Sequence, residues 1–386
     1  MQNFKEKKKV LIALSGGIDS AVSAYLLIKQ GYKVEAAFMK NWTSQEGLLK
    51  NECPWLSDRR DALRVAAFLG IKMHTLDFEE AYKRTVMKYF FEEYKKGRTP
   101  NPDVMCNKEI KFKLLYNWAM KKGFDFMATG HYARISSKIE GIKSSYPLTT
   151  TNYKLDRSKD EFKDQTYFIY NIKNEQLRHL LFPVGNMTKS QVKVLAKKIG
   201  LPNAQKKESM GLCFVGKIRL KDFLEQKLKI KPGEIVDQAG QKLGRHQGLQ
   251  NYTLGQRQGI KVGQGGPYFV YGKDLKHNIL YVTNNPDDEQ LLTKEVQIHS
   301  VNWLANPWSM EHGAWNKKRK VIYDSSPKVY LQARYRHQGG LVPIAIVRIK
   351  NDLYQAVFKK PQKAVASGQS LVLYKGKECV GGGVIV

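Results

Sequence analysis

Cysteine is scarce in this sequence, acidic residues are outnumbered, and long apolar segments are missing. The four cysteines, at positions 53, 106, 213 and 379, form no C-x-x-C pair. This spacing argues against a zinc ribbon and against an iron–sulfur cluster held by closely spaced cysteine pairs. No apolar run approaches the length of a membrane-spanning helix, and the lysine-rich first residues lead into only five apolar ones. We therefore expect a cytoplasmic protein with no membrane-spanning segment.

Basic residues exceed acidic residues by 65 to 35, which gives a net charge of +30. Lysine and arginine release counterions when they contact phosphates, so this charge favours a nucleic acid as partner. The alternative is a general bias toward lysine on a solvated surface. The chain has 386 residues, of which 42% are hydrophobic and 11% are aromatic. This composition is typical of a globular protein, and the length predicts two or three domains.

The two best-known phosphate-binding motifs are also missing. The nearest match to G-x-x-x-x-G-K-[ST], residues 211–217, is followed by Ile218 and is not preceded by a strand. The chain has instead Ser15-Gly16-Gly17-Ile18-Asp19-Ser20, between the apolar run 10–14 and a helical pattern. A turn from strand to helix leaves backbone N–H groups that can bind an anion. Asp19 alone would repel phosphate, so we interpret it as a Mg²⁺ ligand; the alternative is a tight turn with ordinary capping.

The sequence SGGIDS after a strand resembles the pyrophosphatase loop, or PP-loop, of enzymes that split ATP into AMP and pyrophosphate. Such enzymes adenylate a carbonyl oxygen and so turn it into a leaving group. By itself, the motif predicts ATP-dependent adenylation and leaves the acceptor open.

Apolar strands alternate with helical patterns over the first part of the chain. This order predicts an α/β fold with a doubly wound parallel sheet. The strands are expected at residues 10–14, 34–39, 71–78 and 124–130, and the helices at residues 58–69, 79–96 and 107–122. Ligands of such sheets bind at the carboxyl ends of the strands, which is where Ser15, Met39 and Gly130 fall.

The character of the sequence changes further along the chain. Polar residues 136–162 are expected to form an irregular, exposed excursion, and residues 188–191 have the form of a capping box that opens a helix. Residues 206–282 are rich in Gly and Gln with little helical period. From about residue 290 onward, short alternating runs separated by turns predict a small β-barrel. We therefore expect three domains, at residues 1–205, 206–282 and 283–386.

A cysteine lies near a helix start in GRTPNPDVMCNKEIKFK, residues 97–113. Within it, Asn101-Pro102-Asp103 supplies a cap, a proline for the first helical position and an acid for the first turn. This carboxylate and Cys106 are three positions apart and would share a face. The helix start and the lysines at 108 and 111 favour a lowered thiol pKa, which the carboxylate opposes. The pair fits a nucleophile beside a carboxylate or, equally, a cysteine on a packed helix.

Cys213 lies between glycines in ESMGLCFVG. With the adenylating loop, two separated cysteines and a basic surface, the chain resembles the tRNA-specific 2-thiouridylase family. The resemblance is carried by the following motifs in order: ALSGGIDS, FMKNW, GRTPNPDVMCNKEIKF, ATGHYAR, KDQTYF, GLCFVG, YTLGQRQGI, QARYRH and SGQSLVLY. It implies a tRNA-uridine 2-sulfurtransferase, in which ATP adenylates the C2 oxygen of the wobble uridine of tRNA and a protein-bound sulfur displaces AMP. It also implies a PP-loop domain, a small central domain and a C-terminal β-barrel.

The resemblance also implies roles for individual residues. Cys213 would receive sulfur as a persulfide from a donor protein, Cys106 would attack it and leave a Cys106–Cys213 disulfide, and Asp103 would help to activate the sulfur or the base. The implied ATP-binding residues are Ala13, Leu14, Ser15, Gly16, Gly17, Ile18, Asp19, Ser20, Met39 and Gly130, with Mg²⁺ accompanying ATP at Asp19. The implied tRNA-contacting residues are Asn101, Pro102, Asp103, His131, Lys163, Asp164, Gln165, Arg334, Tyr335 and Gln369, the first three touching the target base. Cys53 and Cys379 are expected to be non-catalytic.

Two other functions fit part of the sequence. A PP-loop enzyme that adenylates its substrate for amidation would also use SGGIDS, but it would not need the Cys106/Cys213 pair. A non-catalytic RNA-binding protein would explain the charge and the basic run 317–320, but not an aspartate in a phosphate loop. Pyrophosphate release that depends on both tRNA and ATP would separate the three functions.

Overall fold

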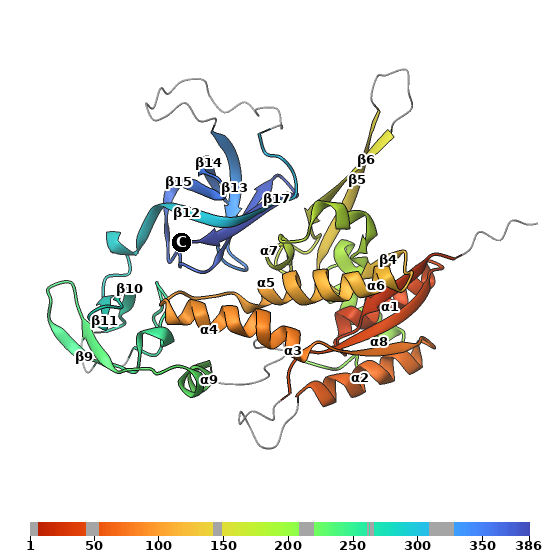
Figure 1. Cartoon of the computed structure of the whole chain (residues 1–386), viewed down its shortest axis with the longest axis horizontal. Coiled ribbons are helices and arrows are strands. Elements are labelled where there is room, and N and C mark those ends of the chain that lie inside the picture. The colour runs from red at the N-terminus through yellow and green to blue at the C-terminus, as the bar shows by residue number, and fades with distance from the viewer. Residues whose placement is uncertain are drawn as a thin grey trace, which may run out of the picture. The chain divides into compact units, whose positions relative to one another are not determined.

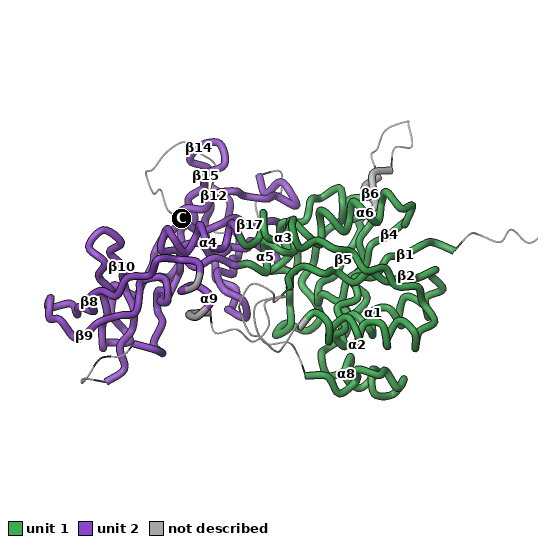
Figure 2. The backbone as a smooth tube through the Cα atoms, turned by 60° about the horizontal axis from the view of Figure 1, so that its bottom comes forward, with its two compact units in different colours: residues 1–87, 102–217, 377–379 green, residues 88–101, 218–376, 380–386 purple. Residues whose placement is uncertain are grey.

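The computed structural model describes residues 7–43, 54–141, 149–207, 220–260, 262, 266–308 and 328–386. The chain divides into two compact units, each with hydrophobic core residues of its own (Figure 2). Unit 1 comprises residues 1–87, 102–217 and 377–379, and unit 2 comprises residues 88–101, 218–376 and 380–386. Within the described ranges, no helix is both long and apolar enough to span a membrane.

A parallel sheet in the order β3-β2-β1-β4-β7 forms the centre of unit 1. Figure 1 labels its strand β4 and the helices α1, α2 and α8 of the same unit. The strands of the sheet are β1 (Lys9–Ala13), β2 (Lys33–Lys40), β3 (Met73–Asp77), β4 (Phe126–Ala128) and β7 (Leu180–Leu181). Val10 of the central strand β1 pairs with Val34 on one side and with Phe126 on the other. Val10, Leu11 and Ile12 are all fully buried, which explains the uninterrupted apolar run. The predicted doubly wound parallel sheet is confirmed.

Several helices complete unit 1. They are α1 (Ile18–Lys29), α2 (Pro54–Phe68), α3 (Glu79–Tyr82), α5 (Pro102–Cys106), α6 (Tyr116–Lys121), α7 (Thr166–Ile169) and α8 (Lys189–Lys198), with 3-10 turns at Asn174–His179 and Pro183–Asn186. Residues of α1, α2 and α8 share one core cluster with Val10 and Ile12. The predicted capping box at the start of α8 is confirmed, because Thr188 Oγ1 accepts from Gln191 N at 3.2 Å and Gln191 Oε1 accepts from Thr188 N at 2.9 Å.

Two predicted helices contain wider, π-type turns. The helix expected over residues 79–96 is observed as α3, a π-type stretch at Lys83–Met87, and α4 (Lys88–Lys95) of unit 2. The helix expected from residue 107 begins earlier, at Pro102, and continues through a π-type stretch at Asn107–Leu115 into α6. Its earlier start follows from Pro102, which fits the first turn of a helix.

The prediction of an irregular excursion over residues 136–162 is wrong for most of its length. Strands β5 (Ala133–Gly141) and β6 (Thr149–Arg157) form an antiparallel hairpin, in which Ala133 pairs with Arg157 and Gly141 with Thr149. The sequence of this hairpin is rich in Ser, Thr and Lys and lacks the apolar alternation that marks a strand with one buried face. Main-chain hydrogen bonds therefore hold a ribbon that the side-chain pattern does not predict.

A closed six-stranded barrel forms the larger part of unit 2, in the order β12-β15-β14-β13-β16-β17 with β17 returning to β12. Its strands are β12 (Leu292–Trp303), β13 (Val329–Arg334), β14 (Val342–Lys350), β15 (Leu353–Lys363), β16 (Ser370–Lys375) and β17 (Glu378–Ile385). Inward-facing residues such as Ile298, Ile346 and Phe358 form its core. The predicted C-terminal β-barrel is confirmed.

A smaller sheet in the order β10-β11-β8-β9 has its own core, which includes Ile235, Val270 and Leu280. The strands of this sheet are β8 (Gly233–Val236), β9 (Lys242–His246), β10 (Phe269–Asp274) and β11 (Ile279–Thr283). The same part of the chain contains helix α9 (Leu220–Lys227) and 3-10 turns at Leu249–Asn251 and Glu289–Leu291. Unit 2 thus contains both the small sheet and the barrel.

Candidate functional site

The turn between β1 and α1 needs glycine at position 16. Gly16 has a φ of +77°, and a Cβ there would lie 2.3 Å from the carbonyl oxygen of Asp58. Two serines brace the turn: Ser20 Oγ donates to Gly17 O at 3.0 Å and accepts from Ser15 N at 3.2 Å. The turn is therefore held in one conformation at the start of α1, where backbone N–H groups favour an anion.

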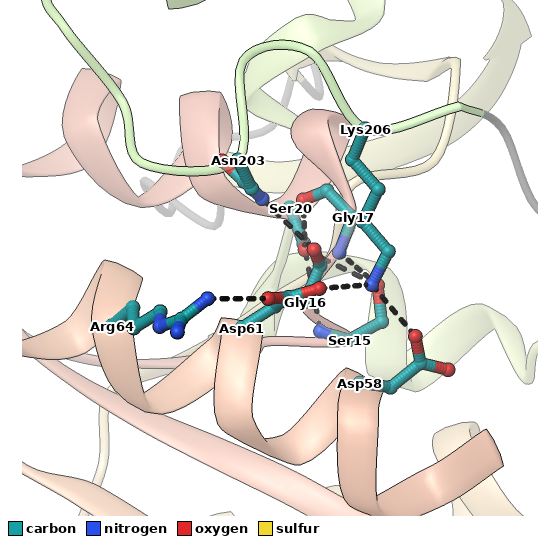
Figure 3. A network of polar contacts seen from close by, with 9 residues as sticks. All are labelled: Ser15, Gly16, Gly17, Ser20, Asp58, Asp61, Arg64, Asn203 and Lys206. Carbon is teal, nitrogen blue, oxygen red and sulfur yellow. Dashed lines mark hydrogen bonds and ion pairs between the residues drawn. The ribbon is translucent and has the colours of Figure 1, made fainter.

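Two side chains from beyond α8 reach this region, one bonding to the turn and one to helix α2 (Figure 3). Asn203 Nδ2 donates to Gly16 O at 2.9 Å, and Lys206 Nζ lies 2.7 Å from a carboxylate oxygen of both Asp58 and Asp61 on α2. Burial lowers the pKa of Lys206, but its hydrogen bonds to the two carboxylates outweigh burial and raise that pKa. Both residues lie outside the phosphate-loop motif, and sequence reasoning missed them.

The predicted ATP-binding residues gather at the carboxyl edge of the sheet. Met39 lies at the end of β2, and Gly130 follows β4, on either side of the turn that follows β1. Gly130 lies close to that turn, since a Cβ on it would be 2.6 Å from Ser20 N. The central position of β1 between β2 and β4 is where a doubly wound sheet forms its ligand crevice.

Asp19 is engaged in an ion pair. Lys189 Nζ, from the first residue of α8, lies 2.6 Å from Asp19 Oδ1 and 2.7 Å from Asp19 Oδ2, and the Tyr132 hydroxyl donates to Oδ1 at 2.8 Å. Lys189 is only 8% exposed. Sequence reasoning treated this lysine only as part of a capping box and missed its place at the phosphate loop.

These contacts do not fit a Mg²⁺ ion bound directly to Asp19. Both carboxylate oxygens already accept hydrogen bonds from an ammonium group, so a metal ion would have to displace Lys189. Across the described part of the chain, no group of three or more His, Cys, Asp and Glu side chains could hold a metal ion.

Cys106 is the last residue of α5 and is 1% exposed. Burial raises the pKa of its thiol to about 12; the nearby charge of Lys111 lowers this pKa, and that of Asp103 raises it. The sequence sets the helix start and the lysines against Asp103; in the structure, desolvation outweighs the lysine and the helix start, and the thiol pKa is raised. The thiol is free and protonated at neutral pH.

His131 is a second buried titratable group in unit 1. Burial lowers its pKa well below the usual value, and the charge of Lys111 acts in the same direction. Its Nδ1 lies 2.7 Å from Thr129 Oγ1, and its ring packs against Phe112 at 5.8 Å between centroids. The charge of Lys111 thus lowers the pKa of both the Cys106 thiol and the His131 imidazole, a link that sequence reasoning did not identify.

The predicted tRNA-contacting segment Lys163-Asp164-Gln165 makes internal contacts. Asp164 is buried and accepts hydrogen bonds from Ser158 N and from the Thr166 hydroxyl. Gln165 Oε1 accepts a hydrogen bond from Tyr132 N at 2.9 Å, and Gln165 N donates one to Tyr132 O at 2.9 Å. Asp164 and Gln165 therefore hold this segment next to Tyr132, which bonds Asp19.

The remaining described tRNA-contact candidates lie in unit 2, apart from Pro102 and Asp103 on α5. Arg334 is buried with its guanidinium 5.5 Å from the centroid of the Tyr374 ring, and the Tyr335 hydroxyl donates to Gln362 Oε1 at 3.3 Å. Gln369 Nε2 donates to the carbonyl oxygens of residues 99 and 100, immediately before Asn101. The structure therefore brings Gln369 to the chain that enters the predicted base-contacting segment.

Of the three other cysteines, the structure describes one. Cys213 and Cys53 lie outside the described residues. Cys379 is fully buried in β17, and its non-catalytic role stays a prediction.

Family comparisons cover nearly the whole chain. A family described as "tRNA methyl transferase HUP domain" matches residues 8–217. A "tRNA methyl transferase PRC-barrel domain" matches residues 221–284, and an "Aminomethyltransferase beta-barrel domain" matches residues 293–385.

Similar proteins match this chain over nearly its full length. The tRNA-specific 2-thiouridylase MnmA of Bacillus licheniformis is 40% identical over 100% of this chain and 96% of its own length. That of Pseudomonas syringae pv. syringae is 41% identical over 98% of this chain and 94% of its own length. Among solved structures, a 4-thiouridine synthetase–RNA complex with bound ATP is 19% identical, with a TM-score of 0.35, over 57% of this chain and 50% of that one. This last likeness is too weak to support a functional conclusion.

Proposed function

Because this chain belongs to the tRNA-specific 2-thiouridylase family, we propose that it transfers sulfur to C2 of the wobble uridine in tRNA while ATP is split into AMP and pyrophosphate. The observation that carries the proposal is the presence, in one unit, of a braced PP-loop and a buried cysteine on a helix beside a carboxylate. The net charge of +30 supports a polyanionic substrate.

ATP is proposed to bind with its phosphates at the turn between β1 and α1. The uracil C2 oxygen attacks the α-phosphate, pyrophosphate leaves, and the oxygen becomes part of an adenylate leaving group. Lys189, held beside Asp19, is the fixed cation available to stabilise negative charge that develops on the phosphates. Mg²⁺ is proposed to accompany ATP, but Asp19 does not fit it as a ligand while paired with Lys189, so no step is assigned to the ion.

The sulfur step is proposed to use both cysteines. The Cys106 thiolate attacks the Cys213 sulfur of a Cys213 persulfide and forms a disulfide, and hydrosulfide leaves. Hydrosulfide then attacks C2 of the adenylated base and AMP leaves; an external thiol reductant must reopen the disulfide. Asp103, on the same helix as Cys106, is the proposed acceptor of the thiol proton.

Further parts of the proposal concern the setting of the reaction. A donor protein that carries a persulfide is proposed to load Cys213, and the reaction is proposed to occur in the cytoplasm. The division into domains near residues 205 and 282 remains a prediction. The tRNA-contacting roles of His131, Arg334, Tyr335 and Gln369 likewise remain predictions.

The test measures pyrophosphate release and modified nucleosides with purified chain, ATP, sulfide and a tRNA transcript. We expect pyrophosphate release only with tRNA and ATP together, and 2-thiouridine at the wobble position by mass spectrometry. A transcript with cytidine at that position is the matched control and should give neither product. Pyrophosphate release with ammonia but without tRNA would indicate amidation, and tRNA binding without pyrophosphate release would indicate a non-catalytic RNA-binding protein.

A further inference from the structure

Residues 97–100, here called the strap, connect α4 to Asn101 within unit 2. The strap lies outside helices and strands, so it has no hydrogen-bond ladder of its own. At its start, Gly97 O accepts a hydrogen bond of 3.0 Å from Lys273 Nζ on β10. Arg98 forms two bonds of 2.5 Å with the buried carboxylate of Glu93 on α4. The first half of the strap is therefore tied to α4 and to the small sheet.

Thr99 joins the strap to both parts of unit 2. Its backbone N donates to Ser367 O, after the barrel strand β15, at 2.9 Å. Its hydroxyl lies 3.0 Å from the hydroxyl of Thr253, which belongs to the small-sheet region and to the motif YTLGQRQGI. The proposed reaction assigns no role to that motif. The contact with Thr99 gives its threonine, Thr253, a structural role in holding the strap.

The end of the strap is held through its carbonyl groups. Gln369 Nε2 donates to Thr99 O at 2.8 Å and to Pro100 O at 3.3 Å. Gly368 has a φ of +87°, and a Cβ on it would lie 2.9 Å from Thr99 O. The glycine of SGQS therefore allows the barrel to approach the strap backbone closely.

Most of these contacts bond to main-chain atoms of the strap, so they fix its path. Resting on the thiolation proposed above, we propose that Thr253, Lys273 and Gln369 are positioning residues for the reaction. They hold the strap and thereby set the place of Asn101, which opens the segment predicted to touch the target base. Loss of the Thr253 or the Lys273 contact should misplace the base and slow turnover without weakening the overall binding of tRNA, because misplacement of about 1 Å can cost a large factor in rate.

Thr253 gives the sharpest test, since it has no predicted tRNA contact. Thr253→Val keeps the shape and removes the hydroxyl, whereas Thr253→Ser keeps the hydroxyl. Thr283→Val is the matched control, because it removes a buried threonine hydroxyl that bonds Asp288 in the same region, away from the strap. Lys273→Met is a second strap variant in case Thr253→Val fails to fold, and Lys273→Arg is its conservative partner.

For each variant, thiolation kcat, the Kd for tRNA and hydrogen–deuterium exchange of a peptide covering residues 97–100 are measured. We expect Thr253→Val to lower kcat about tenfold with the Kd for tRNA nearly unchanged, and to speed exchange of the strap. Thr253→Ser and Thr283→Val should keep the native kcat and strap exchange. A Thr253→Val variant with native kcat and native exchange would overturn the inference. Failure of the native chain to thiolate would instead overturn the proposed function, while strap exchange would still report on the contacts.

Discussion

Asp19 and Lys189 place a carboxylate and an ammonium group against each other at the start of α1. Asp19→Ala should abolish ATP- and tRNA-dependent pyrophosphate release and leave tRNA binding largely intact. It should also lower the free energy of unfolding by about 2 kcal/mol, because it leaves the Lys189 ammonium group, 10% exposed, without its hydrogen-bond acceptor. Pyrophosphate assays, filter binding and denaturant unfolding measure the three effects.

The double variant Asp19→Ala/Lys189→Met separates stability from activity. Removing both charges should restore much of the lost stability, since neither charge is then left alone in the site. Pyrophosphate release should stay absent. If Asp19→Ala lost tRNA binding together with pyrophosphate release, the assignment of Asp19 to the nucleotide site alone would be wrong.

The raised pKa of Cys106 predicts a shift in its reactivity with pH. Burial raises this pKa to about 12 from an ordinary value of 9.0, so the folded chain keeps the thiol protonated where an unfolded chain would lose the proton. The corresponding contribution to stability is fully present below pH 9 and is lost as pH rises through the folded pKa. In the native chain without tRNA, alkylation of Cys106 should therefore remain slow up to about pH 9.

Mass spectrometry of the iodoacetamide-labelled peptide that contains Cys106 tests this expectation. The same peptide labelled in denaturant is the control and should follow the ordinary thiol pKa. Rapid labelling of the native chain at pH 7 would show that the thiol is exposed or its pKa lowered.

At the scale of elements, Lys206 ties the chain after α8 to helix α2. Lys206→Met should weaken ATP binding about five- to tenfold, because Asp58 and Asp61 lose their shared cation beside the phosphate loop. Lys206→Arg should retain most of the affinity. Calorimetric titration with ATP measures the change, and the Kd for tRNA should stay close to native.

The neighbouring Lys207 is the matched control for this prediction. Its side chain is exposed, so Lys207→Met removes the same charge without touching the contacts of Lys206. If both methionine variants weakened ATP binding equally, the effect would come from net charge and the contact with α2 would not matter.

Local patterns predicted those elements that carry their own signal. The apolar run at β1, the glycine turn after it and the capping box at Thr188 each depend on residues a few positions apart. The contacts of Asn203 with Gly16 and of Lys189 with Asp19 span 187 and 170 positions, and no periodicity marks such polar pairs. The hairpin β5–β6 escaped prediction for a related reason, because backbone pairing holds it while its side chains show no apolar alternation.

For the whole molecule, the excess of basic residues predicts tRNA binding that depends steeply on salt. Each neutralised phosphate contributes slightly less than one to the log–log slope, so contact with about six phosphates predicts a slope near −5. Filter binding from low to moderate potassium chloride measures it, with ATP affinity over the same range as a control. A nearly flat tRNA series would mean that the +30 charge reflects composition and not a binding surface.

Neither compact unit is one continuous stretch of chain, since residues 377–379 belong to unit 1 and residues 88–101 to unit 2 (Figure 2). During synthesis, a ribosome that has made residues 1–217 has not yet supplied the partners of β6 from the C-terminal end. At that stage Lys154 lacks its 2.7 Å ion pair with Glu378, and Arg157 N lacks its 2.8 Å hydrogen bond to Lys377 O. Strand β17, which is made after residues 1–376, therefore completes the unit whose first residues are made earliest, and a premature stop near residue 376 would leave both units unfinished.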